Sequence, residues 1–166
     1  MAVNWHEHLS STGVPRFHFV DSVNCDSAAL LLATGDLGFV EFKVDGHRVH
    51  TKDDLVDQLA ESARFPSGFG RNWDAVSDYL RDLSWVPARG YVLLVTDGDN
   101  LIRLDRRDLV AFIGVVEATI QDWRDERGEY GERSAPIAFH LVLCGTNALK
   151  AEISKVLTEA FCEHST

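Results

Sequence analysis

The chain has 166 residues, which is enough to bury a substantial hydrophobic core in one domain and short for two. Its composition, with 45% hydrophobic and 25% charged residues, is that of a globular protein and excludes an intrinsically disordered chain. The 16 basic and 26 acidic side chains give a formal net charge of −10, which disfavours binding to nucleic acid or anionic lipid and favours basic protein partners.

The N-terminal part of the chain carries weak structural signals. Residues 1–15 are polar and contain no apolar h-region, so we expect an irregular leader that is not a signal peptide. Weak alternation predicts a short strand at 16–20, and a following apolar stretch predicts a short helix at 26–34 that ends at Gly35. No apolar run in the chain is long enough to cross a bilayer, so we expect no membrane association.

From residue 39 onward, strand patterns and helix patterns alternate. Clean alternation predicts a strand at 39–44, and continuous apolar runs predict buried strands at 91–95 and 137–143. The predicted helices run from Thr51 to the residues before Pro66, from Asn72 to about Leu83, from Asp105 to about Trp123, and over 147–162, with a polar loop at 126–135. Strands separated by helices predict an α/β fold with a mainly parallel sheet of about four strands and helices packed on its faces.

The three cysteines, Cys25, Cys144 and Cys162, are odd in number, and none belongs to a Cys-x-x-Cys pair. This pattern is typical of free thiols in a reducing compartment and not of a disulfide framework or a zinc site. We therefore expect a cytoplasmic protein with no bound metal and no cofactor.

The segment 66–85 contains a glycine-rich loop followed by a short helix. Asn72 can cap this helix, and Asp74, Asp78 and Asp82 recur every four residues along one face of it. Carboxylates at that spacing repel one another and destabilise the helix by a few tenths of a kcal/mol per pair. The face is either simply solvated or kept for a function outside the helix.

The same segment resembles the signature of the barstar family of ribonuclease inhibitors without a gap. The matching positions are Pro66, Phe69, Gly70, Asn72, Asp74, Ala75, Val76, Asp78 and Leu80. The order of the flanking strands and helices also agrees with the family. The resemblance covers about 38–143 and implies a single barstar-like domain over 1–166, with 1–37 as an N-terminal extension and 147–162 as an additional C-terminal helix.

The resemblance implies that the loop and the helix plug the active site of a small basic ribonuclease with carboxylates. In the family, Asp74 and Asp78 fall on binding positions, and Asp78 falls on the central aspartate that meets the catalytic Arg and His groups of the nuclease. This chain departs from the family at Gly68 and Ser77, where the family has aromatic residues, and at Arg81, which would face the basic partner. The partner-binding residues predicted on this basis are Gly68, Phe69, Asp74, Ser77, Asp78, Arg81, Asp82, Trp85, Asp122 and Glu126, the last two from the end of the long helix.

We accordingly expect an immunity or antitoxin protein without catalytic residues, monomeric and bound 1:1 to its nuclease. Two alternatives stay open. The acidic helix could serve a basic partner that is not a nuclease. Asp97 and Asp99, which follow the buried strand at 91–95, could be the carboxylates of a Mg²⁺-dependent phosphotransferase, although the same Asp-Gly-Asp-Asn sequence is also an ordinary turn.

Overall fold

The structure of the chain is a computed structural model that describes residues 2–11, 16–125, 127–128, 131–132 and 136–162. A four-stranded sheet, in the order β1-β6-β3-β2, forms its centre, and all of its neighbouring strands are parallel. The strands are β1 (Phe17–Asp21), β2 (Val40–Asp45), β3 (Gly90–Thr96) and β6 (Ala138–Gly145). The two central strands, β3 and β6, are almost entirely buried, because helices cover the sheet on both faces. The predicted α/β fold with a parallel sheet is confirmed.

Four helices cover one face of the sheet: α3 (Lys52–Ser62), α4 (Trp73–Asp82), α5 (Arg106–Arg124) and α6 (Asn147–Cys162). Their start signals are local. Thr51 and Asp54 form the predicted capping box of α3, and Asn72 and Asp105 cap α4 and α5. The apolar faces of these helices pack on inward-facing strand residues that alternate along each strand, among them Val44, Val95 and Leu143.

The opposite face is covered by a thinner layer, which we call the N-terminal layer: α1 (Trp5–Ser10), the short helix η1 (Ser22–Asn24) and α2 (Ser27–Leu37). The expectation of an irregular leader is wrong for α1, because Trp5 and Leu9 are buried against the sheet. The expected end of the next helix is also wrong. α2 continues through Gly35 and ends at Gly38, whose φ of 71° lets it close the helix with hydrogen bonds to the carbonyls of Thr34 and Gly35.

The remaining elements are short. The helices η2 (Gly46–Arg48) and η3 (Gly98–Arg103) follow β2 and β3, and β4 (Arg127–Gly128) pairs with β5 (Gly131–Glu132) within the segment expected to be a polar loop. At Gly46, an added Cβ would lie 2.3 Å from the carbonyl oxygen of Asp97, so only glycine allows β2 and β3 to end side by side here.

A disulfide joins Cys25, which follows η1, to Cys144 on β6. The prediction of free thiols is therefore wrong for these two residues, and the side chain of Cys162 lies outside the described part of the chain. The bond connects residues 119 positions apart in the sequence. It fixes the N-terminal layer covalently to a central strand of the sheet.

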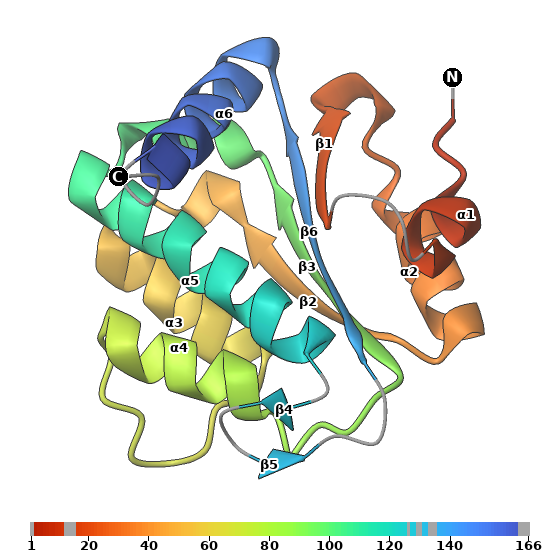
Figure 1. Cartoon of the computed structure of the whole chain (residues 1–166). Coiled ribbons are helices and arrows are strands. Elements are labelled where there is room, and N and C mark those ends of the chain that lie inside the picture. Colours follow the sequence, from red (N-terminus) through yellow and green to blue (C-terminus); the bar gives the residue numbers. More distant parts are fainter. Residues whose placement is uncertain (1, 12–15, 126, 129–130, 133–135, 163–166) are drawn as a thin grey trace.

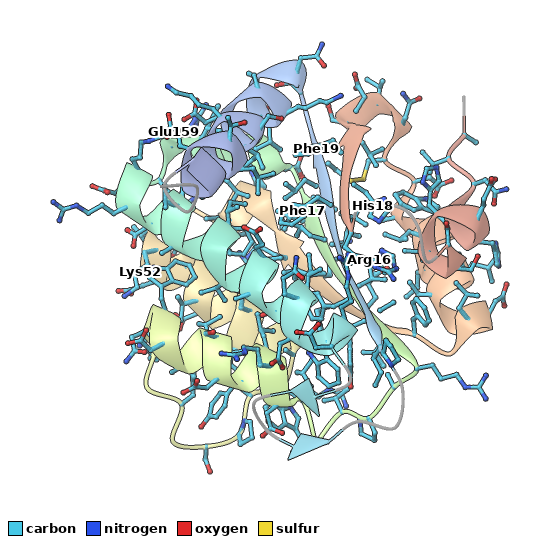
Figure 2. All side chains as sticks on the ribbon, in the orientation of Figure 1. Arg16, Phe17, His18, Phe19, Lys52 and Glu159 are labelled. Atoms are coloured by element: carbon cyan, nitrogen blue, oxygen red, sulfur yellow. A yellow bond between two sulfur atoms is a disulfide. The ribbon has the colours of Figure 1, made fainter. Side chains whose placement is uncertain are left out.

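Strand β1 contacts the helices on both faces of the sheet, because its side chains point alternately to one face and to the other (Figure 2). Phe17 and Phe19 point toward α5 and α6 and pack on the larger core. His18 points toward α1, and its Nε2 lies 2.9 Å from Nδ1 of the fully buried His140 on β6. The Nε2 atom of His140 lies 3.1 Å from the backbone oxygen of Leu9 in α1, so this histidine pair links α1 to the sheet.

Candidate functional site: the acidic helix and its loop

The candidate site is built on α4 and on the loop that connects it to α3 (Figure 1). The helix is strongly amphipathic: Val76 and Leu80 are buried in the core, whereas Asp74 and Asp78 are exposed and Asp82 is half-buried. The side chain of Asn72 accepts a hydrogen bond of 2.8 Å from the backbone N–H of Ala75, which fixes the start of the helix. The structure therefore places the three predicted carboxylates on the outward face of one rigid helix.

The loop before α4 holds a conformation that depends on left-handed residues. Gly68 has a φ of 92°, and Arg71 has a φ of 52°. Arg71 is held by a 2.8 Å hydrogen bond from its guanidinium to Asp57 on α3. A side chain at Gly68 would have open space but a strained backbone, so glycine at a position where the family has an aromatic residue follows from this local geometry.

One side of α4 faces α5, and there the charges are paired within the fold. Arg81 donates a 3.4 Å hydrogen bond to Asp122 on α5, with 21% of the Arg81 side chain and 9% of the Asp122 side chain exposed. The sequence predicted that Arg81 would face the basic partner and that Asp122 would add a second acidic contact. The structure places these two groups against each other, so Asp122 is a counter-charge to Arg81 within the fold. Their contact with a partner stays a prediction.

Two of the predicted residues remain, Ser77 and Glu126. Ser77 is half-buried on the α5 side, next to Trp73, whose indole N–H donates to Asp108 at the start of α5. Glu126 lies outside the described residues, so its predicted role stays a prediction.

The other side of α4 carries a group of aromatic side chains that sequence reasoning did not assemble. Phe65 and Phe69 from the loop, Tyr79 from α4 and Trp85 from the segment after it are all half-buried and in mutual contact. Tyr79 escaped the sequence analysis, because it lies between the apolar and acidic faces of the helix. The sequence signal that could have identified Tyr79 is its spacing of three residues from Asp82, which places the two side chains next to each other on the helix surface. The aromatic content of the surface is thus higher than the substitutions at Gly68 and Ser77 imply.

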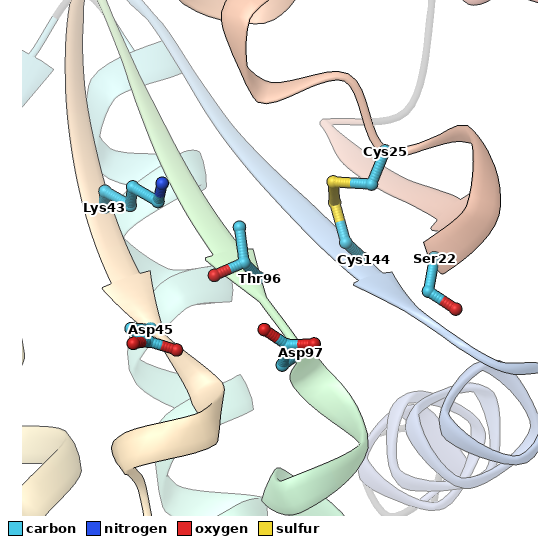
Figure 3. Close-up of a pocket in the computed structure, with 7 residues that line it drawn as sticks. All are labelled: Ser22, Cys25, Lys43, Asp45, Thr96, Asp97 and Cys144. Atoms are coloured by element: carbon cyan, nitrogen blue, oxygen red, sulfur yellow. A yellow bond between two sulfur atoms is a disulfide. The ribbon is translucent and has the colours of Figure 1, made fainter.

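The phosphotransferase alternative depends on Asp97 and Asp99 acting together. Asp97 lines an open cavity of about 380 Å³ at the carboxyl ends of the strands, together with Lys43, Asp45 and Thr96 (Figure 3). Asp99 does not line this cavity. Its carboxylate accepts hydrogen bonds from the backbone N–H and the hydroxyl of Thr146, immediately before α6.

The two aspartates therefore diverge, and Asp99 serves the start of a helix, where the helix dipole favours an anion. Among the residues that the structure describes, no three His, Cys, Asp or Glu side chains come together in a way that could hold a metal ion. Nor does that part of the chain contain a helix long and apolar enough to cross a membrane.

Solved structures similar to this chain show its fold. They include the ORC2 protein of Aeropyrum pernix in ADPNP–ADP complexes (TM-score 0.60, 11% identity, 90% of this chain and 41% of that one). The Walker-type ATPase paby2304 of Pyrococcus abyssi is also similar (TM-score 0.52, 12% identity, 92% of this chain and 47% of that one). This chain spans less than half the length of these structures. The phosphate-binding sequence Gly-x-x-x-x-Gly-Lys-Ser/Thr does not occur in it.

A search of curated proteins finds no match to the chain. The model of the family described as Barstar (barnase inhibitor), in contrast, matches residues 39–144. The match agrees with the expected core of 38–143 and includes β2, α3, the loop, α4, β3, α5 and nearly all of β6. It covers well over half of the sequence and contains the acidic helix with its loop. The chain therefore belongs to the Barstar (barnase inhibitor) family.

Proposed function

We propose that this protein is a stoichiometric inhibitor of a small basic ribonuclease and that it blocks the nuclease active site with α4 and the preceding loop. The observation that carries the proposal is the position of Asp74 and Asp78. They are exposed side by side on the outward face of a capped helix, within the segment that matches the inhibitor family. Asp78 stands where the resemblance places the central binding aspartate.

The electrostatics support the same proposal. A protein with a net charge of −10 attracts a basic partner over long range, and the attraction raises the association rate. In the complex, a carboxylate that loses its water against several fixed cations forms short charge-assisted hydrogen bonds. Removing that carboxylate leaves the cations buried without a counter-charge, which makes such positions binding hot spots.

The test is a comparison of Asp78→Ala with a control variant. We expect Asp78→Ala to weaken binding to the ribonuclease by at least about 2 kcal/mol, roughly 30-fold in Kd, while the denaturant midpoint of the free protein stays within about 0.5 kcal/mol of the parent. Asp53→Ala removes the same charge from the exposed first turn of α3 and should change the affinity far less.

The ribonuclease is obtained by capture from the native host on the immobilised chain, followed by mass spectrometry and an RNA-cleavage assay. We expect the captured protein to cleave RNA and to lose that activity at a 1:1 ratio of inhibitor. If the captured basic protein has no ribonuclease activity, the partner is a basic protein other than a nuclease. Equal binding of the parent and Asp78→Ala would rule out this docking mode.

We also propose a cytoplasmic location. The three cysteines from which the sequence predicts it include a disulfide pair, and this disulfide gives a direct test of the location. Disulfides in mesophilic cytosolic proteins are rare and are mostly transient or redox-sensing. Trapping thiols with an alkylating reagent at the moment of cell lysis would report whether Cys25 and Cys144 are reduced in the cell. A fully oxidised pair would point to an oxidising compartment and would contradict the proposed location.

A further inference from the structure

The aromatic side chains beside α4 form a compact surface with a defined geometry. We call Phe65, Phe69, Tyr79 and Trp85 the aromatic cluster. The ring of Phe65 lies 4.9 Å from that of Phe69 and 5.2 Å from that of Tyr79, and the rings of Tyr79 and Trp85 are 5.5 Å apart. Each of the four is partly exposed, so the cluster is neither a sealed core nor a set of isolated surface rings.

Two contacts make the cluster rigid before any partner binds. The indole N–H of Trp85 donates a 3.0 Å hydrogen bond to the backbone oxygen of Ala63 at the end of α3, which fixes the ring against the loop. After α4, Leu83 adopts a left-handed conformation, with a φ of 46°, and its side chain is fully buried. The chain is thereby turned so that Trp85 returns to the side of Tyr79. A rigid aromatic surface loses little conformational entropy on binding.

An unpaired carboxylate lies directly beside the cluster. Asp82 follows Tyr79 by three residues and is therefore its neighbour on the helix surface. Asp82 forms no hydrogen bond or ion pair with the described residues, in contrast to Asp122 on the other side of the helix, which pairs with Arg81. The hydroxyl of Tyr79 likewise donates to none of the described residues.

This combination matches one chemical group. An arginine guanidinium is planar, stacks on aromatic rings and at the same time donates hydrogen bonds from its edge to a carboxylate. A lysine ammonium can lie over a ring or pair with the carboxylate, but it has no planar group that does both at once, and an apolar side chain would leave the carboxylate desolvated. The surface is continuous with the acidic face of Asp74 and Asp78, which suits a partner that carries many positive charges.

We infer that the aromatic cluster and Asp82 form a receptor for an arginine side chain of the basic partner, with the guanidinium stacked on Tyr79 and bonded to the Asp82 carboxylate. The inference rests on the proposed function for the identity of the partner. It adds a specificity element on the side of α4 away from α5: a partner with lysine at the contacting position would bind more weakly than one with arginine.

The first arm of the test needs no ribonuclease. Tetra-arginine and tetra-lysine peptides, which carry equal charge, are titrated into the ¹³C-labelled protein while the ring resonances of Phe69 and Tyr79 are observed. We expect tetra-arginine to shift these resonances in a saturable way in the parent and in Tyr79→Phe, and not in Tyr79→Leu. Equal shifts with tetra-lysine, or unchanged binding of tetra-arginine to Tyr79→Leu, would overturn the receptor.

The second arm uses the captured ribonuclease. Tyr79→Leu keeps an apolar side chain for packing but removes the ring, and we expect it to raise Kd about tenfold. Asp82→Asn should raise Kd about threefold without affecting the fold. Tyr79→Phe should bind like the parent. If Asp78→Ala loses affinity while Tyr79→Leu and Asp82→Asn do not, the receptor is wrong and the proposed function stands; if none of these variants loses affinity, the docking mode itself is wrong.

Discussion

Helices α4 and α2 lie on opposite faces of the same sheet, and they present opposite surfaces to solvent (Figure 1). The outward face of α4 carries three aspartates, and its inward face is apolar. α2 exposes apolar side chains instead: Leu30 is buried, whereas Leu31 and Leu32 are 58% and 66% exposed. The family match from 39 to 144 includes α4 and excludes α2. The layer that carries the family signature therefore presents carboxylates to solvent, whereas the layer outside the match is held to the sheet by the disulfide, by apolar contacts and by the His18–His140 pair.

Removal of the disulfide should give the largest difference between the two layers in their effects on stability and on binding. We expect Cys25→Ser to lower the free energy of unfolding by about 4 kcal/mol, because the bond closes a loop of 119 residues in the unfolded chain. Affinity for the basic partner should stay the same, since α4 packs on the other face of the sheet. Denaturant midpoints with and without reductant measure the first effect. Reductant should destabilise the parent and leave the variant unchanged. Equal midpoints for the parent and the variant without reductant would show that the disulfide does not stabilise the N-terminal layer.

The next largest effect concerns the α4 layer. Asp122→Ala should lower the free energy of unfolding by about 2 kcal/mol, because it removes the ion pair between the Asp122 carboxylate and the mostly buried Arg81 guanidinium. The cost stays below that of a fully buried pair, since 21% of the Arg81 side chain is exposed. Asp74→Ala, at an exposed position, should change stability by less than about 0.5 kcal/mol. If Asp122→Ala instead keeps its stability and loses affinity for the partner, Asp122 belongs to the partner-binding surface.

A third effect should appear as a pH dependence of the N-terminal layer. Burial lowers the pKa of His140 to about 3, with a further contribution from the neighbouring His18 and Arg16. Burial also lowers the pKa of His18 to about 4, helped by the nearby charges of His8 and Arg16. Both imidazoles are therefore neutral in the folded protein, whereas in the unfolded chain they bind protons below about pH 6.5.

Because the unfolded state takes up these protons first, stability should be full above about pH 6.5 and fall as the pH drops toward 4. His140→Gln should reduce this slope, whereas His47→Gln, at an exposed position in η2, should keep it. Hydrogen exchange of α1 and β1 at pH 7 and pH 5 locates the change. Protection lost first in α4 would contradict the assignment of the effect to the N-terminal layer.

The fold was predictable wherever the signal was local. The continuous apolar runs of β3 and β6 and the capping box at Thr51 could be read directly, because their causes lie within a few residues. Contacts between distant residues could not. No spacing rule joins Cys25 to Cys144, and nothing in the sequence of α4 shows that Arg81 turns toward α5. At the end of α2 the sequence offered two glycines, and only the left-handed conformation of Gly38 identifies the one that closes the helix.

The same contrast applies to the candidate site. The acidic face followed from the spacing of Asp74, Asp78 and Asp82, because residues four apart share one side of a helix. The aromatic cluster could not be assembled in that way, since its members come from a loop, a helix and a following turn. Their proximity depends on the left-handed backbone at Leu83, where a non-glycine residue adopts a conformation that local propensity disfavours.

The edge position of β1 also constrains the order in which the molecule can be completed. In the sheet, β1 pairs with β6 alone, so Phe17 meets a strand partner more than 120 residues later in the chain, at Leu141. At a synthesis rate of about 5–20 residues per second, the nascent β1 waits on the order of ten seconds before its partner leaves the ribosome. During that interval α2 has only the β2–β3 pair to cover, because the β6 side chains that complete its apolar contacts are not yet made.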